Sequence, residues 1–161
     1  YPQKPLLPAD PVERNRCLVL EDWADAVFMA AVRRLVYWNA SRVPGGMEKL
    51  FFPESKGLRR WFFGRIARRA VRKRFGLSAR RYGHDKKEVL RSAQLAVQWL
   101  DGRNFLVGDQ MSIADITLAA MTAPLGVTEE ELKADPAVAQ LLSWGREILA
   151  ECYPKEYGWI A

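Results

Sequence analysis

Apolar residues recur every three or four positions along most of this chain, which is the spacing of amphipathic helices. The longest such stretch follows Asp10-Pro11-Val12-Glu13, which supplies an N-cap, a proline at the first helical position and an acid at the third. It ends near residues 39–41, and its apolar face holds Leu20, Trp23, Ala24, Val27, Ala31, Leu35 and Trp38. We expect one helix of about 28 residues, roughly 42 Å long.

The same spacing predicts further helices downstream. Asp85 and Glu88 have the positions of a capping box and open a helix that stops at Gly102. Thr128 begins a short acidic helix, and Asp135-Pro136 begins another with a stripe of Val138, Leu141, Leu142, Gly145, Ile148 and Leu149. No alternating strand pattern of useful length occurs, so we predict an all-α bundle of about five to six helices.

The best-defined helix start lies between Phe105 and Leu118. Ser112 and Asp115 have the spacing of a capping box, and Met111 and Ile116 are placed to form a hydrophobic staple around it. The short apolar run at 105–107 is interpreted as an extended connector packed beneath this helix. Ser112 and Asp115 are therefore given a structural role and no catalytic one.

These motifs carry a family resemblance. Phe105-Leu-Val-Gly-Asp before the capping box and Ile116-Thr-Leu-Ala after it resemble the helical C-terminal domain of the glutathione transferase superfamily. Tyr1-Pro2, the proline-rich run up to Pro11, Glu13-Arg14 and Trp23-Ala-Asp25 resemble the family's interdomain linker and the helix that follows it. The resemblance is good over 1–38 and 99–122 and looser elsewhere. It implies a linker at 1–9 and a helical domain at 10–161.

The resemblance also implies a division of labour in a cytoplasmic detoxification enzyme. Glutathione, the co-substrate, would be activated by a Ser, Tyr or Cys of an N-terminal thioredoxin-like domain, and no such segment is found in these residues. We therefore expect no catalytic residue here and no activity of residues 1–161 alone. This chain would supply the hydrophobic electrophile site, with Met29, Arg33, Tyr37 and Trp38 as its wall and Trp159 as a lid, although each of these residues also suits packing or the surface.

The resemblance implies a homodimer as well, with much of the dimer surface on this chain. If the thioredoxin-like domain is absent, the long first helix has lost the cover of its apolar surface, and such patches seldom stay exposed. We then expect self-association, or the C-terminal tail folded over that face.

Composition limits the chemistry. A chain of 161 residues, 49% hydrophobic and 27% charged, fits one globular domain, and no apolar run approaches the ~18–20 residues of a membrane span. Cys17 and Cys152 leave a disulfide open, but free thiols in a reducing compartment are the preferred interpretation. The single histidine, His84, is assigned to a turn, and no metal site is expected.

The positive charge is concentrated in one segment. Residues 56–87 hold 13 Lys and Arg and one acid, whereas the other residues hold 12 basic and 18 acidic side chains. A helix here would present Leu58, Trp61, Phe62, Ile66, Ala70 and Phe75 on one face, surrounded by Arg59, Arg60, Arg65, Arg68, Arg69, Arg72 and Lys73. The preferred interpretation is that the apolar face packs into the bundle.

Three other interpretations of this basic segment stay open. It could attract anionic ligands to a nearby cleft, lie on an anionic membrane or contact nucleic acid. The last two define the alternative function, a non-catalytic protein-, RNA- or membrane-interaction module. Similar helical domains are fused to translation factors, aminoacyl-tRNA synthetases and mitochondrial import proteins.

Overall fold

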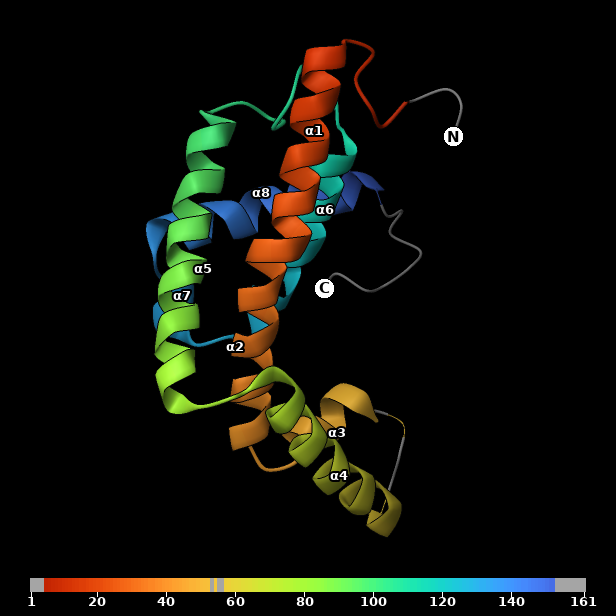
Figure 1. Ribbon diagram of the computed structural model, residues 1–161, viewed down its shortest axis with the longest axis vertical. Coiled ribbons are helices and arrows are strands. Elements are labelled where there is room, and N and C mark those ends of the chain that lie inside the picture. Colours follow the sequence, from red (N-terminus) through yellow and green to blue (C-terminus); the bar gives the residue numbers. More distant parts are fainter. Residues whose placement is uncertain (1–4, 53, 55–56, 153–161) are drawn as a thin grey trace.

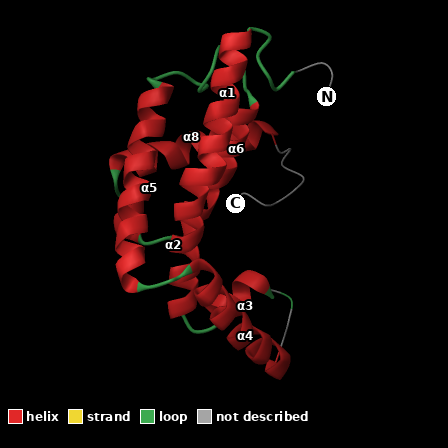
Figure 2. Ribbon diagram, in the orientation of Figure 1, coloured by secondary structure: helices red, strands yellow, loops and turns green. Residues whose placement is uncertain are grey.

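The computed structural model describes residues 5–52, 54 and 57–152, and the regular structure in these ranges is helical throughout (Figures 1 and 2). The predicted all-α class is confirmed. The elements are α1 (Pro11–Trp23), a π-helical turn (Ala24–Phe28), α2 (Met29–Arg42), α3 (Gly46–Phe51), α4 (Gly57–Phe75), α5 (Ala79–Leu100), α6 (Ile113–Thr122), a 3₁₀ turn (Ala123–Val127), α7 (Glu130–Lys133) and α8 (Pro136–Cys152). The sequence analysis did not anticipate α3, which begins after Gly45 at φ +73°.

The bundle is organised around the first long helix. Helix α5 runs back alongside α2, α6 packs on both α1 and α8, and α5 also contacts α8 (Figure 1). Helices α3 and α4 lie at the far end of α2, away from α1, and α4 packs chiefly on α3 and α2. The main core gathers buried side chains from α1, the π-helical turn, α2, α5, α6 and α8, among them Phe28, Leu35, Val89, Leu118 and Leu141.

A π-helical turn changes which residues of the first helix are buried. Ala24 accepts a hydrogen bond from the backbone of Met29, five residues on, so one extra residue is accommodated in this turn. The inward position is consequently taken by Phe28, which is fully buried. Val27, expected on the core face, is exposed. That expectation was wrong because it assumed an uninterrupted 3.6-residue repeat.

Two predicted helix starts and one predicted end are confirmed. The carboxylate of Asp10 accepts from the backbone N–H groups of Val12 and Glu13, both at 2.9 Å, and that of Asp135 caps α8 in the same way. Helix α5 ends at Leu100, where Asp101 and Gly102 both have positive φ. The start of α7 is shifted by one residue, because Glu129 is the N-cap and the Thr128 hydroxyl donates to the carbonyl of Leu125.

Asp85 does not open a helix. Helix α5 begins at Ala79, with Ser78 as its N-cap, and Asp85 lies in its second turn with 1% exposure. Its carboxylate accepts from Nε and Nη2 of Arg34 at 2.6–3.0 Å, which ties α5 to α2. The predicted capping box at Asp85 was therefore wrong, and so was the turn assigned to His84, which is an exposed residue within α5.

The capping box at the start of α6 is formed as predicted. Asp115 is fully buried, and its Oδ2 accepts from the backbone N–H of Ser112 at 2.8 Å and from the Ser112 hydroxyl at 2.6 Å. Its Oδ1 accepts from the backbone N–H of Leu106 at 2.7 Å, which fixes the connector beneath the helix. The linker joins the same site, because the carbonyl of Leu6 accepts from the N–H of Ile113 at 2.9 Å. One carboxylate thus secures the helix start and the connector, and the linker docks beside them.

Removal of the Asp115 carboxylate should be among the most destabilising single changes. Asp115→Ala leaves three buried donors without their acceptor, and each such loss costs about 1–3 kcal/mol, so we expect a loss of about 3–5 kcal/mol. Urea unfolding followed by circular dichroism measures this. Asp109→Ala, an exposed acid in the same connector, should stay within about 0.5 kcal/mol of the parent chain. Equal effects of the two variants would contradict the anchoring role.

Loss of the Asp85 carboxylate should cost far more than loss of its neighbouring surface cation. Asp85→Ala leaves the mostly buried Arg34 guanidinium unpaired, for which we expect about 3 kcal/mol. Lys86→Ala removes ion pairs to the exposed acids Glu129 and Glu131 and should cost at most about 1 kcal/mol. Denaturant unfolding of both variants tests the difference. If Asp85→Ala cost no more than Lys86→Ala, the link between α2 and α5 would be energetically unimportant.

Candidate functional site

Three of the predicted electrophile-site residues share one ridge of α2. Met29, Arg33 and Tyr37 are spaced four residues apart, so they follow one face of the helix, and each is partly exposed. Met29 packs against the edge of the main core. The ring of Tyr37 lies 5.6 Å from Phe51 of α3 and 5.1 Å from Phe75 of α4, which closes the ridge at that end.

Trp38 lies on a different side of α2, in a cleft between α2, α5 and the segment before α7. Its ring is 8% exposed and stacks on Tyr82 of α5 at 5.8 Å, and the guanidinium groups of Arg42 and Arg72 lie 5.5 and 6.0 Å from its centroid. The cleft is also lined by Asn39, Val43, Ala79, Val127, Thr128 and Glu129. The structure therefore does not bring Trp38 together with the Met29–Tyr37 ridge, and Trp159 lies outside the described residues.

The Tyr82 hydroxyl is held in its neutral form in this cleft. Burial is the largest cause that raises its pKa above the ordinary value for tyrosine, and the hydrogen bond and negative charge of Glu129 raise it further. Asn39 acts in the opposite direction but weakly. Because its single proton is donated to Glu129, the hydroxyl can accept a hydrogen bond from a ligand donor, and its raised pKa keeps it from acting as a base near neutral pH.

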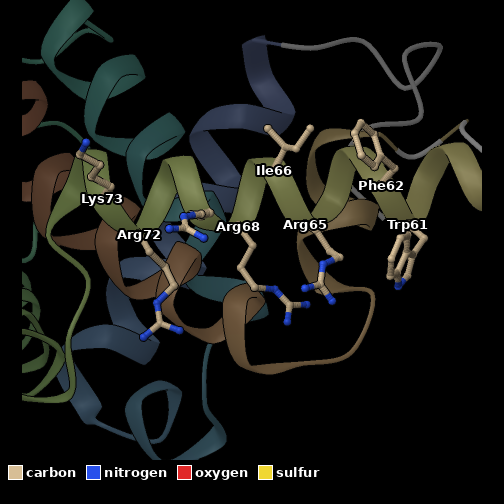
Figure 3. A pocket seen from close by; sticks show the side chains of 8 residues that line it. Trp61, Phe62, Arg65, Ile66, Arg68, Arg72 and Lys73 are labelled. Atoms are coloured by element: carbon tan, nitrogen blue, oxygen red, sulfur yellow. The ribbon is translucent and has the colours of Figure 1, made fainter.

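The outer face of α4 is the second surface that stands out. Trp61, Phe62 and Ile66 are 53%, 55% and 51% exposed. They border a shallow hollow together with Arg65, Arg68, Arg69, Arg72 and Lys73 (Figure 3). We call these eight residues the basic–aromatic face.

The preferred interpretation of this segment was largely wrong, because Trp61, Phe62, Ile66 and Ala70 are exposed rather than packed into the bundle. Of the predicted apolar face, Phe75 does pack, against Tyr37 of α2, and the side chain of Leu58 lies outside the described part of the chain. Gly64 is buried, and a Cβ at that position would overlap the side chain of Glu48 in α3. At this contact Glu48 Oε2 and Arg68 Nε are buried without a hydrogen-bond partner in the described part of the chain. Close packing at Gly64 and the ring contact between Phe75 and Tyr37 therefore hold α4 on α3 and α2.

A comparison with family models decides the relationship of this chain. The model of the glutathione S-transferase C-terminal domain matches residues 60–151, more than half of the chain. The chain belongs to the glutathione S-transferase superfamily. This match covers most of α4 and all of α5, where the motifs noted in the sequence resemble the family less closely. It does not include the linker or the first long helix, which also carry the resemblance. No curated protein and no solved structure matches the chain.

In this helical domain, the described side chains suited to thiol or metal chemistry are few. Cys17 and Cys152 are both free; Cys17 is buried, and burial raises the pKa of the Cys152 thiol, with the acid Glu151 as the next cause. Over the same ranges no group of three or more His, Cys, Asp or Glu is placed to hold a metal ion. None of the helices in these ranges is long and apolar enough to cross a membrane.

The Trp38 cleft contains residues that the sequence analysis did not identify. Tyr82 precedes the helix start predicted at Asp85, so the misplaced start of α5 hid its position on the same helix and beside Trp38. Asn39 and Glu129 carry no motif, and only the folded chain brings them to Tyr82. An aromatic residue one turn before a buried acid on the same helix, as Tyr82 is before Asp85, was the available signal.

The raised pKa of Tyr82 predicts how stability changes at high pH. Because the folded chain holds the Tyr82 proton more tightly than the unfolded chain, the contribution is complete below the ordinary tyrosine pKa of about 10 and is lost as the pH rises above it. The free energy of unfolding should therefore fall more steeply above pH 10 in the parent chain than in Tyr82→Phe.

Absorbance at 295 nm, taken as the difference between the parent chain and Tyr82→Phe, should show Tyr82 ionising at higher pH than the reference compound N-acetyltyrosinamide. Glu129→Gln removes the negative charge that also raises the Tyr82 pKa. In this variant Tyr82 should ionise at lower pH than in the parent chain, but still at higher pH than the reference compound. Ionisation of Tyr82 together with the reference would show that the hydroxyl is solvated and would contradict the geometry of the cleft.

Proposed function

We propose that this chain forms the helical wall of a hydrophobic electrophile site in a glutathione transferase-like enzyme, with glutathione as co-substrate. The observation that carries the proposal is the ridge of Met29, Arg33 and Tyr37 on α2 in a chain of this superfamily. A thioether and an aromatic ring offer an adaptable apolar surface with few polar anchors, which suits varied small electrophiles. Arg33 lies between them, where it can approach a carboxylate of glutathione.

The thiol chemistry is assigned to a thioredoxin-like domain outside these residues. In the reaction, the glutathione thiolate forms a bond to an electrophilic carbon, and the leaving group departs with the electron pair of the bond that breaks. Neither Cys17 nor Cys152 suits the activation of glutathione. Cys17 is inaccessible, and the raised pKa of Cys152 favours its neutral thiol. Activation by a Ser, Tyr or Cys of the other domain follows the family pattern.

An exposed apolar face on α1 indicates that another domain or subunit packs against this helix. Val12 and Val19 are seven residues apart, so they lie on one face, and they are 76% and 66% exposed. Leu18 and Val27 extend the exposed apolar surface. Surfaces of this kind are normally covered by another domain or a second subunit. We assign this face to the thioredoxin-like domain or to the partner of a homodimer.

Binding of an unreactive electrophile analogue tests the assignment of the ridge. 2,4-Dinitrotoluene has the shape of a chloronitrobenzene substrate but lacks its leaving group, and it quenches tryptophan fluorescence on binding. The double variant Met29→Ala with Arg33→Ala removes half-buried contact surface, and we expect binding about five- to tenfold weaker. The matched control is Val127→Ala, an exposed apolar residue at the other cleft, which should bind like the parent chain.

The catalytic part of the proposal is tested separately. Residues 1–161 alone should not accelerate the conjugation of 1-chloro-2,4-dinitrobenzene with glutathione above the uncatalysed rate. Clear turnover by this chain would contradict the assignment of thiol activation to another domain. Equal analogue binding by the parent chain and the double variant would remove the ridge from the site.

A further inference from the structure

The arrangement of side chains on α4 has no role in the proposed electrophile site. Trp61, Arg65, Arg68 and Arg72 follow one edge of the basic–aromatic face, while Phe62, Ile66 and Lys73 follow the other (Figure 3). The large apolar residues occupy the N-terminal part of this face and the cations extend to its C-terminal part. We propose that this face docks the protein on the surface of an anionic phospholipid membrane.

The exposed apolar side chains are the first reason. Three large apolar residues, Trp61, Phe62 and Ile66, lie within two turns of the helix, and each leaves about half of its surface in solvent. Exposed apolar residues gathered in this way mark an interaction surface rather than ordinary surface variation. Trp and Phe are also the side chains that interfacial helices place at the boundary between headgroups and acyl chains.

The second reason is the free positive charge beside them. Within the described ranges, none of Arg65, Arg68, Arg69, Arg72 and Lys73 takes part in an ion pair, although the rest of the chain carries a net negative charge. Arg65 lies over the ring of Trp61, 5.1 Å from its centroid, so the cationic and apolar parts of the face adjoin. Unpaired cations are drawn to the negative potential of an anionic leaflet.

The placement of α4 makes the face available to a flat surface. Helix α4 has 19 residues, roughly 28 Å of length, and lies at the end of the molecule remote from α1 (Figure 1). Gly64 lies against α3 on another side of the helix, and the members of the face that remain exposed to solvent include Trp61, Phe62, Arg65, Ile66, Arg69 and Lys73. Because none of the helices in the described ranges can span a bilayer, the contact is peripheral.

A nucleic acid would bind the cations of the basic–aromatic face, but it would not need the exposed aliphatic side chain among them. Phosphate contacts from Lys and Arg give salt-dependent affinity, and exposed aromatic rings can stack on bases. Ile66 offers no stacking surface, and it lies beside Phe62 on the edge of the face where both suit insertion among acyl chains. The lipid surface accounts for the three exposed apolar side chains and for Arg65, Arg69 and Lys73 beside them, whereas Arg68 Nε is buried and Arg72 also lies over Trp38. RNA is the alternative that the experiment separates.

Vesicle co-sedimentation tests the proposal with the full chain. Vesicles of phosphatidylcholine with about 30% phosphatidylserine should bind the protein at low salt, and vesicles of phosphatidylcholine alone should bind it far less. The triple variant Arg65→Gln, Arg69→Gln and Lys73→Gln should bind on the order of a hundredfold more weakly, at about one order of magnitude or less per cation. The control Arg16→Gln, Arg91→Gln and Arg146→Gln removes the same charge from exposed positions on α1, α5 and α8 and should retain most of the binding.

The depth of the aromatic residues gives a second measurement. Lipids brominated on their acyl chains should quench part of the tryptophan fluorescence of the bound protein, and Trp61→Phe should lose most of that quenching while still co-sedimenting. Circular dichroism verifies that each variant keeps its helices. Equal binding by the two triple variants would show that only net charge matters and would overturn the proposal. Tight binding of a 20-nucleotide RNA, measured by anisotropy, without vesicle binding would overturn it in favour of nucleic acid.

Discussion

The buried carboxylate of Asp115 is the interaction on which the rest of this fold depends. Its two oxygens receive three donors, from Ser112 and Leu106, in a region that excludes water, so the charge is stabilised by hydrogen bonds rather than by a cation. The start of α6 and the connector before it consequently have one relative position. Because α6 packs on both α1 and α8, that single position also helps to fix the first and the last of these helices.

The sequence could predict those features whose stabilising contacts lie between residues close together in the chain. Caps at Asp10, Ser112 and Asp135 act within three residues of themselves, so their helices could be located from the sequence alone. Asp85 has the same local pattern, yet its carboxylate pairs with Arg34, 51 residues away, and that partner cannot be recognised from spacing. The π-helical turn is similar: it goes together with the burial of Phe28 among residues from other helices, and no local motif marks its position.

The candidate sites show the same division. The family resemblance suggested Met29, Arg33, Tyr37 and Trp38 as one wall, and α2 carries the first three on one ridge and Trp38 on another side. The helical repeat could not tell which side of α4 faces the bundle, because Trp61, Phe62 and Ile66 have the composition of a core. In the structure Gly64 lies against the Glu48 side chain of α3, and Phe75 packs on Tyr37 of α2. Both contacts are with residues far away in the sequence, so the spacing of apolar residues within α4 could not reveal them.

The hydrogen bond from Ile113 N–H to the carbonyl of Leu6 gives the residues before α1 an influence beyond their own length. The first N–H of a helix has no partner within that helix, so Ile113 depends on a group supplied from more than a hundred positions earlier. A rotation of the peptide at Leu6 would deprive α6 of that acceptor. The position of residues 5–9 is thereby coupled to the start of α6 through one backbone group.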